Sequence, residues 1–203
     1  MSGKKGILFV VSAPSGGGKG TILKRVFNDK SKVYYSVSAT TRKPRDEDTD
    51  GVTYHFLSRE EFEKRIKEND FLEYVEYCGN YYGTPKSEIV KNLSSGKDVV
   101  LEIETEGAFN VKKAMPEAVL IFIIPPSVTE LRRRLEKRGT EDKETIDKRM
   151  RQAINEIRLA GKYDYIVING ELEEAVADFS AVCKAARIKQ DAENIINEVL
   201  ENA

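Results

Sequence analysis

The chain has 203 residues, a formal net charge of −1 and 40% hydrophobic residues. Such a length and composition predict one globular domain with a substantial core. A nearly neutral chain is not expected to bind nucleic acid or a membrane surface as its main function. The apolar run Ile7–Val11 is too short for a signal peptide, and Ala118–Ile124 is far short of a membrane span. These features predict a cytoplasmic location.

A structural metal site or a disulfide framework is not indicated. Cys78 and Cys183 are far apart in the sequence, and His55 is the only histidine, so a zinc-binding set cannot be assembled. We expect two reduced and buried thiols, as is usual in a cytosolic protein.

Short apolar runs alternate with helical patterns along most of the chain. The runs expected to form buried strands are Ile7–Val11, Tyr34–Val37, Val99–Ile103, Val119–Ile124 and Tyr165–Ile168. The patterns expected to form helices are Thr21–Asn28, Gly107–Ala114, Val128–Lys137, Lys143–Ala160 and Leu172–Leu200, the last with a break or bend. This alternation predicts an α/β fold in which a largely parallel, doubly wound sheet is flanked by helices.

One charged and aromatic segment, residues 39–85, departs from the alternation. Within it, Val52–Leu57 and Phe71–Tyr77 alternate like half-exposed strands, and Glu60–Lys67 has a helical pattern between them. This arrangement predicts a small α+β insert carried by the core.

A second segment, residues 135–159, is helical and rich in arginine and lysine. Arg138-Gly139-Thr140 near its start indicates a hinge, so we expect a helical lid. The chain is then a single domain, 1–203, whose core comprises about 1–38, 86–134 and 160–203.

A glycine-rich loop follows the first expected strand and precedes the first expected helix. Backbone N–H groups of such a loop surround nucleotide phosphates at a helix N-terminus, and Lys19 would reach the β- and γ-phosphates. The predicted nucleotide-binding P-loop consists of Ala13, Pro14, Ser15, Gly16, Gly17, Gly18, Lys19, Gly20 and Thr21.

The loop departs from the usual P-loop pattern at two positions. Ala13 stands where glycine is usual, and Gly20 stands where a serine or threonine normally binds Mg²⁺, with Thr21 one residue later. We therefore expect nucleotide oxygens and water to hold most of the Mg²⁺ coordination, with Thr21 as a candidate ligand.

A second phosphate-binding group is indicated within the insert. Arg42 and Arg45 are three residues apart with Pro44 between them, and two guanidinium groups can grip a terminal phosphate. Tyr54 and Tyr82 supply neutral hydroxyl donors. Each of these residues alone is more often a surface or packing residue, but their joint presence favours a phosphate site.

These motifs resemble those of the guanylate kinase family. The resemblance rests on Thr40-Thr41-Arg42, Arg45, Asp48, Gly51, Tyr54, Phe56 and Leu57, and continues in Glu73, Asn80–Thr84, Glu102–Gly107, Pro125–Ser127, Arg138–Thr140 and Val167–Asn169. It covers nearly the whole chain, to about Arg187. It implies a P-loop enzyme that transfers the γ-phosphoryl group of ATP to GMP.

The resemblance also implies the residues of the acceptor site. Those expected to hold the GMP phosphate are Arg42, Arg45, Tyr54 and Tyr82, and those expected to contact guanine are Ser38, Glu73, Thr84 and Glu104. The chemistry of guanine agrees, because its adjacent N1–H and N2–H₂ donors suit a carboxylate and its O6 suits a hydroxyl donor. Adenine has an acceptor at N1, which a carboxylate would oppose.

Two acidic positions differ from many relatives. Glu102 and Glu104 stand where an Asp-x-Asp pair is common, and Glu106 stands where glutamine is common. Two carboxylates at the end of a buried strand are costly unless they bind something. We expect one of the pair to contact guanine and the other, Glu102, to serve Mg²⁺ or Lys19. The glutamate at position 106, in place of the common glutamine, has no physical explanation.

The lid carries the remaining expected site residues. By the resemblance, Arg138 and Arg149 close over the ATP phosphates, and with Lys19 and Arg45 they are the expected catalytic residues. Asn169 is implied near adenine, although its position before Gly170 is equally typical of a turn. The other arginines here are assigned mainly to solvated helix faces: Arg132, Arg133, Arg134, Arg151 and Arg158.

The predicted reaction is direct in-line transfer from ATP to GMP, and to dGMP, with Mg²⁺ as cofactor. No general base is needed, because the GMP phosphate is largely ionised at neutral pH. The chain is expected to be a monomer or a homodimer. Two alternatives stay open. Glu73 and Glu104 argue against a different nucleoside-monophosphate acceptor, and Lys19 argues against a non-catalytic module that binds phosphorylated partners.

Overall fold

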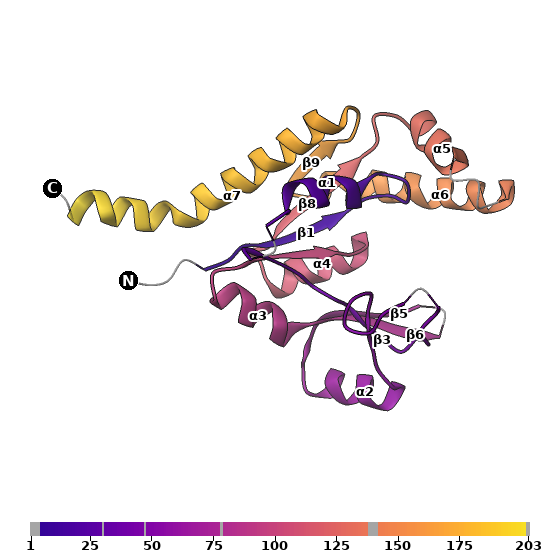
Figure 1. Ribbon diagram of the computed structural model, residues 1–203, viewed down its shortest axis with the longest axis horizontal. Coiled ribbons are helices and arrows are strands. Elements are labelled where there is room, and N and C mark those ends of the chain that lie inside the picture. Colours follow the sequence, from indigo (N-terminus) through magenta and orange to yellow (C-terminus); the bar gives the residue numbers. More distant parts are fainter. Residues whose placement is uncertain (1–4, 30, 47, 78, 138–141, 202–203) are drawn as a thin grey trace. The chain divides into compact units, whose positions relative to one another are not determined.

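The computed structural model describes residues 5–29, 31–46, 48–77, 79–137 and 142–201 (Figure 1). The strands are β1 Leu8–Ser12, β2 Val33–Tyr35, β3 Ala39–Thr40, β4 His55–Phe56, β5 Phe71–Tyr77, β6 Asn80–Pro85, β7 Asp98–Glu102, β8 Val119–Ile124 and β9 Tyr165–Ile168. The α-helices are α1 Lys19–Val26, α2 Arg59–Lys67, α3 Lys86–Ser94, α4 Thr105–Ala114, α5 Val128–Lys137, α6 Lys143–Leu159 and α7 Leu172–Glu201.

The larger sheet has the strand order β2-β7-β1-β8-β9. Strand β2 pairs in parallel with β7, with Val33 opposite Asp98, and β8 pairs in parallel with β9, with Ile121 opposite Tyr165. Strand β8 is wholly apolar, and β1 is buried along its whole length and apolar except for Ser12, as expected for a parallel sheet covered on both faces. The predicted α/β fold, with a parallel sheet flanked by helices, is confirmed.

The chain forms two compact units, and the division falls within β1. One unit holds residues 1–10 and 31–118, and the other holds residues 11–30 and 119–203. The predicted phosphate loop belongs to the second unit, and the predicted acceptor residues belong to the first.

The smaller sheet lies in the first unit and has the order β4-β3-β6-β5. Helix α2 packs on it through Phe62, which stacks on Phe71 at 4.2 Å between ring centroids and on Tyr81 at 5.1 Å. Ser58 caps α2 by accepting a hydrogen bond from the backbone N–H of Glu61. These elements all lie between residues 39 and 85, which the sequence marked as an insert.

The strand expected over residues 52–57 is largely wrong. Only His55–Phe56 forms a strand, because the residues before it are held in a turn. The Thr53 hydroxyl donates to the carbonyl of Thr49 at 3.0 Å and accepts from its N–H at 3.0 Å, while Gly51 has φ 73°.

Two helices of the second unit, α5 and α6, lie side by side (Figure 1). Their shared core contains Leu131, Leu135, Ile146 and Met150. An ion pair of 2.8 Å between Arg132 and Asp147 joins them, so Arg132 has a structural contact.

Helix α7 runs without interruption from Leu172 to Glu201, and Figure 1 shows it with a bend, in agreement with the expected break or bend. Phe179 packs edge-on against Phe27 at 5.8 Å, next to α1. Cys183 forms no disulfide with another described residue, and it is only half-buried, whereas a buried thiol was expected. Cys78 lies outside the described residues. Among the described helices, none combines the length and apolar character that crossing a membrane requires.

Candidate active site

The phosphate loop joins β1 to α1 within the second unit. Gly16 and Gly18 have φ values of 86° and 87°, a conformation that glycine adopts without strain. Gly18 is also the N-cap of α1 and provides no side-chain cap. The Thr21 N–H donates to the Gly18 carbonyl at 3.1 Å, and no side chain caps the first turn. A helix N-terminus of this kind is a natural site for an anion. Lys19 is the first residue of the helix.

Asn169 is buried against this loop. Its side-chain amide donates to the carbonyl oxygen of Gly17 at 2.7 Å, and a Cβ atom at Gly18 would collide with it. The guanidinium of Arg134 donates to the Asn169 carbonyl at 3.0 Å and to Glu130 at 2.8 Å. Asn169 thus helps to fix the loop, and Arg134, which the sequence assigned to a solvated face, holds Asn169.

Glu130 is the acidic partner in this group. Hydrogen bonds from Arg133 and Arg134 lower the pKa of its carboxyl to about 2, so it stays ionised throughout the neutral range. A cavity of about 710 Å³ lies beside it, lined by residues that include Pro126, Arg134 and Gly170.

The described part of the lid segment contacts the loop through Arg149. Arg149, on α6, donates to the Ser15 hydroxyl at 3.2 Å. Arg138, the other arginine expected here, lies outside the described residues. Thr21 is exposed in the first turn of α1, and a Cβ at Gly20 would meet nothing within 4 Å.

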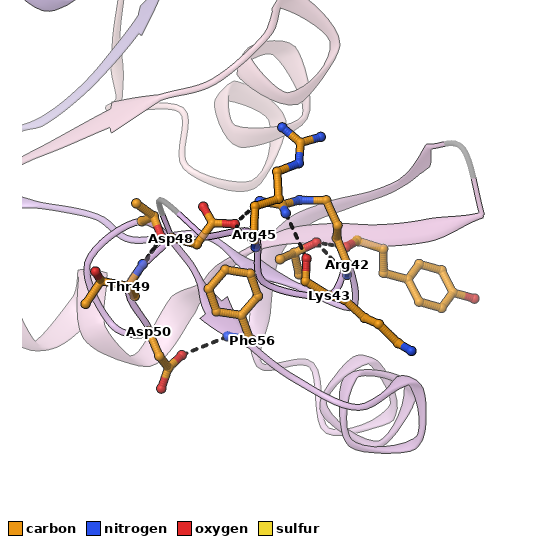
Figure 2. Close-up of polar contacts among 10 residues, drawn as sticks. Arg42, Lys43, Arg45, Asp48, Thr49, Asp50 and Phe56 are labelled. Atoms are coloured by element: carbon orange, nitrogen blue, oxygen red, sulfur yellow. Dashed lines mark hydrogen bonds and ion pairs between the residues drawn. The ribbon is translucent and has the colours of Figure 1, made fainter.

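In the first unit, Arg42 is held by Asp48 (Figure 2). The Asp48 carboxylate accepts from the Arg42 guanidinium at 2.8 Å and from the Arg45 backbone N–H at 2.8 Å. The Arg45 N–H is the largest cause that lowers the pKa of Asp48, and the bond to Asp48 raises the pKa of Arg42. One carboxylate therefore fixes both the side chain of Arg42 and the backbone three residues later.

Aromatic rings complete this group around Arg42. Its guanidinium lies 5.5 Å from the ring centroid of Tyr54 and 5.7 Å from that of Phe56. Tyr82, which pairs with Thr40 across the sheet, contacts Tyr54 edge-on at 6.0 Å. The structure therefore brings Arg42, Tyr54 and Tyr82 together.

The side chain of Arg45 points away from Phe56 (Figure 2). Its guanidinium projects from the loop without a drawn contact (Figure 2), and its residue is exposed. Within the described ranges, no ion pair is found for it.

Glu73 and Thr84 form a separate polar pair. They are directly opposite each other on β5 and β6, and the Thr84 hydroxyl donates to the Glu73 carboxylate at 2.5 Å. Glu73 is only 9% exposed, and burial raises the pKa of its carboxyl. Its second oxygen, Oε2, would lie 3.2 Å from a Cβ at Gly107, so α4 approaches Glu73 closely and a side chain at residue 107 would crowd the carboxylate.

The pH dependence of stability tests this burial. Between the ordinary carboxyl pKa of 4.5 and the raised pKa of folded Glu73, the folded chain binds more protons than the unfolded chain. The free energy of unfolding should therefore fall, relative to that of a Glu73→Gln variant, as the pH rises through this interval. Denaturant unfolding without nucleotide, repeated from about pH 4 to pH 8, measures the difference. A constant difference would contradict the raised pKa.

Glu104, Glu102 and Ser38 are the other polar candidates in the first unit. Glu104 is the N-cap of α4, less than one helical turn before Gly107, and it is exposed. Glu102 ends β7 and is exposed too, so the expected cost of burying both carboxylates does not apply. The pKa of Tyr35 is raised to about 12, mainly by burial and to a smaller extent by the negative charge of Glu102. Ser38 is half-buried, and its carbonyl accepts from the His55 N–H at 2.9 Å.

Three residues have structural roles that the site prediction omitted. Asp48 belongs to the family-like motif, and its spacing from Arg42 and Arg45 could have suggested an ion pair. Gly107 and Arg134 act through contacts between distant segments of the chain, and no local sequence pattern predicts such contacts.

The two units together define a class of protein. A strand, a glycine-rich loop and a helix opened by Lys19 form a P-loop, while the other unit carries a cation–tyrosine group and a buried carboxylate–hydroxyl pair. This combination is that of a P-loop enzyme acting on nucleotides.

Comparison with known proteins identifies the family. The guanylate kinase family model matches residues 5–186. A guanylate kinase of Thermus thermophilus is 52% identical over 187 residues, which are 92% of this chain and 83% of that relative. One of Clostridium tetani is 46% identical over 206 residues, 97% of this chain and 99% of the relative.

A solved structure of guanylate kinase from Anaplasma phagocytophilum is similar with a TM-score of 0.70 and 32% identity, covering 91% of this chain and 88% of that one. The chain belongs to the guanylate kinase family, whose members transfer the γ-phosphoryl group of ATP to GMP.

Proposed function

We propose that the acceptor site of this kinase recognises GMP through two groups of side chains. Glu73, Thr84, Ser38 and Glu104 contact guanine, and Arg42, Arg45, Tyr54 and Tyr82 hold the phosphate. The observation that carries the proposal is the buried Glu73 carboxylate, one oxygen of which accepts from Thr84.

Burial makes this carboxylate a strong selector of the base. The adjacent N1–H and N2–H₂ donors of guanine compensate a desolvated carboxylate, whereas adenine directs an acceptor at it. A base that leaves such a group unpaired is disfavoured by about 10⁴-fold. The raised pKa of Glu73 fits a site completed by the donors of its ligand.

The phosphate group of GMP fits the cation–tyrosine group. Arg42 is already oriented by Asp48 and by the rings of Tyr54 and Phe56, so little side-chain entropy remains to be lost on binding. Arg45 has an exposed guanidinium that can move onto the transferring phosphoryl group, which is why we assign it a catalytic role as well.

The donor site consists of the P-loop, 13–21, with Asn169 and the lid arginines. ATP phosphates accept from the uncapped N–H groups of α1, and Lys19 neutralises charge on the transferring group. Arg149 already contacts Ser15 of the loop, which supports a place over the phosphates. Arg138 is assigned to the same role by family resemblance alone.

Mg²⁺ is proposed to arrive with ATP. Among the residues that the structure describes, no three His, Cys, Asp or Glu side chains are grouped to hold a metal ion. Mg²⁺ does not require such a group, because it keeps several waters and is usually bound by phosphate oxygens plus one or two protein ligands. The candidate protein ligands are Thr21 and Glu102. When bound, the ion neutralises charge on the phosphates and aligns them.

The proposed mechanism is direct in-line transfer without a covalent enzyme intermediate. Phosphoryl transfer needs alignment and positive charge, which Lys19, Arg45, Arg138 and Arg149 supply, and the ionised GMP phosphate needs no general base. Use of dGMP is part of the proposal, because none of the assigned contacts requires a 2′-hydroxyl. A cytoplasmic location stays a prediction.

Replacing Arg42 by alanine tests the phosphate assignment. We expect the KM for GMP to rise by about 10²-fold, the effect of losing a bidentate charged contact, with the KM for ATP nearly unchanged. Asp48→Asn should give a smaller rise, because it loosens Arg42 without removing it. Steady-state kinetics with each substrate varied measure both effects. Arg65→Ala, in the ion pairs of α2, is the matched control, and an unchanged KM for GMP in Arg42→Ala would refute the assignment.

A further inference from the structure

The hydroxyl of Thr40 is buried at the end of β3, two residues before Arg42. Thr40 is the last residue of this strand, and none of its surface is exposed. A hydroxyl in such a place has to be hydrogen-bonded, because burying it unpaired destabilises the fold. Valine would fill the same space without needing a partner. The hydrogen bonds of this hydroxyl therefore indicate what a polar side chain does here.

These hydrogen bonds join two segments of the insert. The Thr40 hydroxyl donates to the carbonyl of Tyr81 at 2.8 Å and accepts from the backbone N–H of Arg42 at 3.1 Å. Tyr81 is on β6, next to Tyr82, which is the partner of Thr40 across the sheet. One hydroxyl thus connects the backbone that carries Arg42 to the strand that carries Tyr82.

Tyr81 is a firmly held anchor for this connection. Its ring stacks on Phe62 at 5.1 Å, and the guanidinium of Arg59 lies 4.5 Å from its centroid and donates to its hydroxyl at 3.2 Å. The Tyr81 N–H donates to the Thr41 hydroxyl at 2.9 Å, and the Tyr81 carbonyl accepts from the Thr41 N–H at 3.1 Å. Both the ring and the backbone of Tyr81 are therefore fixed within the first unit.

Arg42 is held at both ends by these contacts. It lies outside any strand, because β3 ends at Thr40, so the sheet does not hold its backbone. Asp48 holds the guanidinium at 2.8 Å, and the Thr40 hydroxyl holds the backbone N–H. A turn of the backbone at residue 42 would be magnified at the end of so long a side chain. Fixing the backbone therefore helps to orient the guanidinium before a ligand binds.

We propose that Thr40 is a positioning residue of the acceptor site, whose hydroxyl fixes the backbone of Arg42 so that the guanidinium meets the GMP phosphate. This inference rests on the proposed assignment of Arg42 to that phosphate. Thr40 acts through Arg42 and does not itself contact the substrate. Loss of its hydroxyl should weaken the contact with the phosphate and leave the contacts with guanine and with ATP intact.

Thr40→Val removes the hydroxyl and keeps the shape of the side chain. We expect the dissociation constant of GMP, measured by titration calorimetry, to rise about fivefold, the usual effect of losing one neutral hydrogen bond. The inhibition constant of guanosine, which has the base but no phosphate, and the KM for ATP should stay within about twofold. Thr40→Ser restores the hydroxyl and should bring GMP binding back to within about twofold of the wild type.

A double variant shows whether Thr40 acts through Arg42. In the Arg42→Ala background, Thr40→Val should change the dissociation constant of GMP by less than about twofold. Thr41→Val is the matched control, because it removes a hydroxyl that is bonded to Tyr81 but not to Arg42. It should leave GMP binding within about twofold. An equal rise in Thr41→Val, a fivefold rise in both backgrounds, or an equal weakening of guanosine would overturn the proposal.

Failure of this inference is distinguishable from failure of the acceptor assignment. If Arg42→Ala weakens GMP binding and Thr40→Val does not, the positioning role of Thr40 is wrong while the assignment of Arg42 stands. If Arg42→Ala leaves GMP binding unchanged, both are wrong. Thr40→Ala is measured beside Thr40→Val, so that a variant without the hydroxyl decides the outcome even if valine prevents folding.

Discussion

Replacing Lys19 by alanine should lower kcat by about 10²- to 10³-fold, the usual effect of removing one fixed charge that acts on the transition state. The loss is expected because Lys19 begins α1 directly after Gly18, where backbone N–H groups lack a side-chain cap. A phosphate bound there would keep its backbone contacts but lose the cation that neutralises charge during transfer. Initial rates of ADP release, with ATP varied at saturating GMP, measure the effect.

A matched control separates this effect from damage to the helix. Lys24→Ala removes a lysine from an exposed position of the same α1 helix and should keep kcat within about twofold. Both variants should melt near the wild-type temperature, because alanine is the best helix former. If Lys19→Ala kept more than about a third of the wild-type kcat, the phosphates would have to bind elsewhere.

Replacing Glu73 by glutamine should lower kcat/KM for GMP by about 10²-fold, without loss of stability. The kinetic loss arises because hydrogen bonds to a charged acceptor contribute about 1.5–3 kcal/mol each, and the new amide would direct a donor at the donors of guanine. Stability should be retained or increased in the absence of nucleotide. A buried, desolvated carboxylate is replaced by a neutral group to which Thr84 can still donate.

Glu76→Gln is the matched control for this substitution. Glu76 is on the same strand, β5, but its side chain is exposed and pairs with Arg59. It should leave the kinetics with GMP unchanged. A Glu73→Gln variant that phosphorylates GMP normally would remove Glu73 from the base site, and one that fails to fold would contradict the account of its burial.

Much of the fold could be predicted from local sequence patterns. The apolar runs from Ile7 to Val11 and from Val119 to Ile124 are buried on both faces, so their composition alone marks them as strands. The P-loop was predictable because its glycines and lysine are contiguous. Helix α3 escaped prediction because its buried positions, Ile89 and Leu93, are few within nine residues.

The acceptor site depends on pairing between distant segments. Glu73 faces Thr84 only because β5 and β6 pair in that register, which shifts between Phe71 and Glu73. No local rule predicts such an irregularity, and a shift of one residue would turn Glu73 to the other face. β6 itself contains Gly83 and Pro85, residues that disfavour a strand in isolation.

The contacts that fix the donor site could not be predicted from the sequence either. Asn169 could have been a turn residue, and its bond to Gly17 joins residues 152 positions apart. Likewise, Arg134 follows two other arginines, and nothing in the sequence distinguishes it from them. Its position on α5 brings its guanidinium to the Asn169 carbonyl.

The central claim is that a buried carboxylate selects guanine, and the most direct test is a parallel assay of acceptors. ADP release from ATP and Mg²⁺ is measured with GMP, AMP, CMP, UMP or dTMP as the only acceptor. The account predicts turnover with GMP that exceeds AMP by about 10⁴-fold in kcat/KM, because adenine leaves Glu73 unpaired. Comparable turnover with AMP would contradict the role of Glu73, even though the P-loop and the fold would stand.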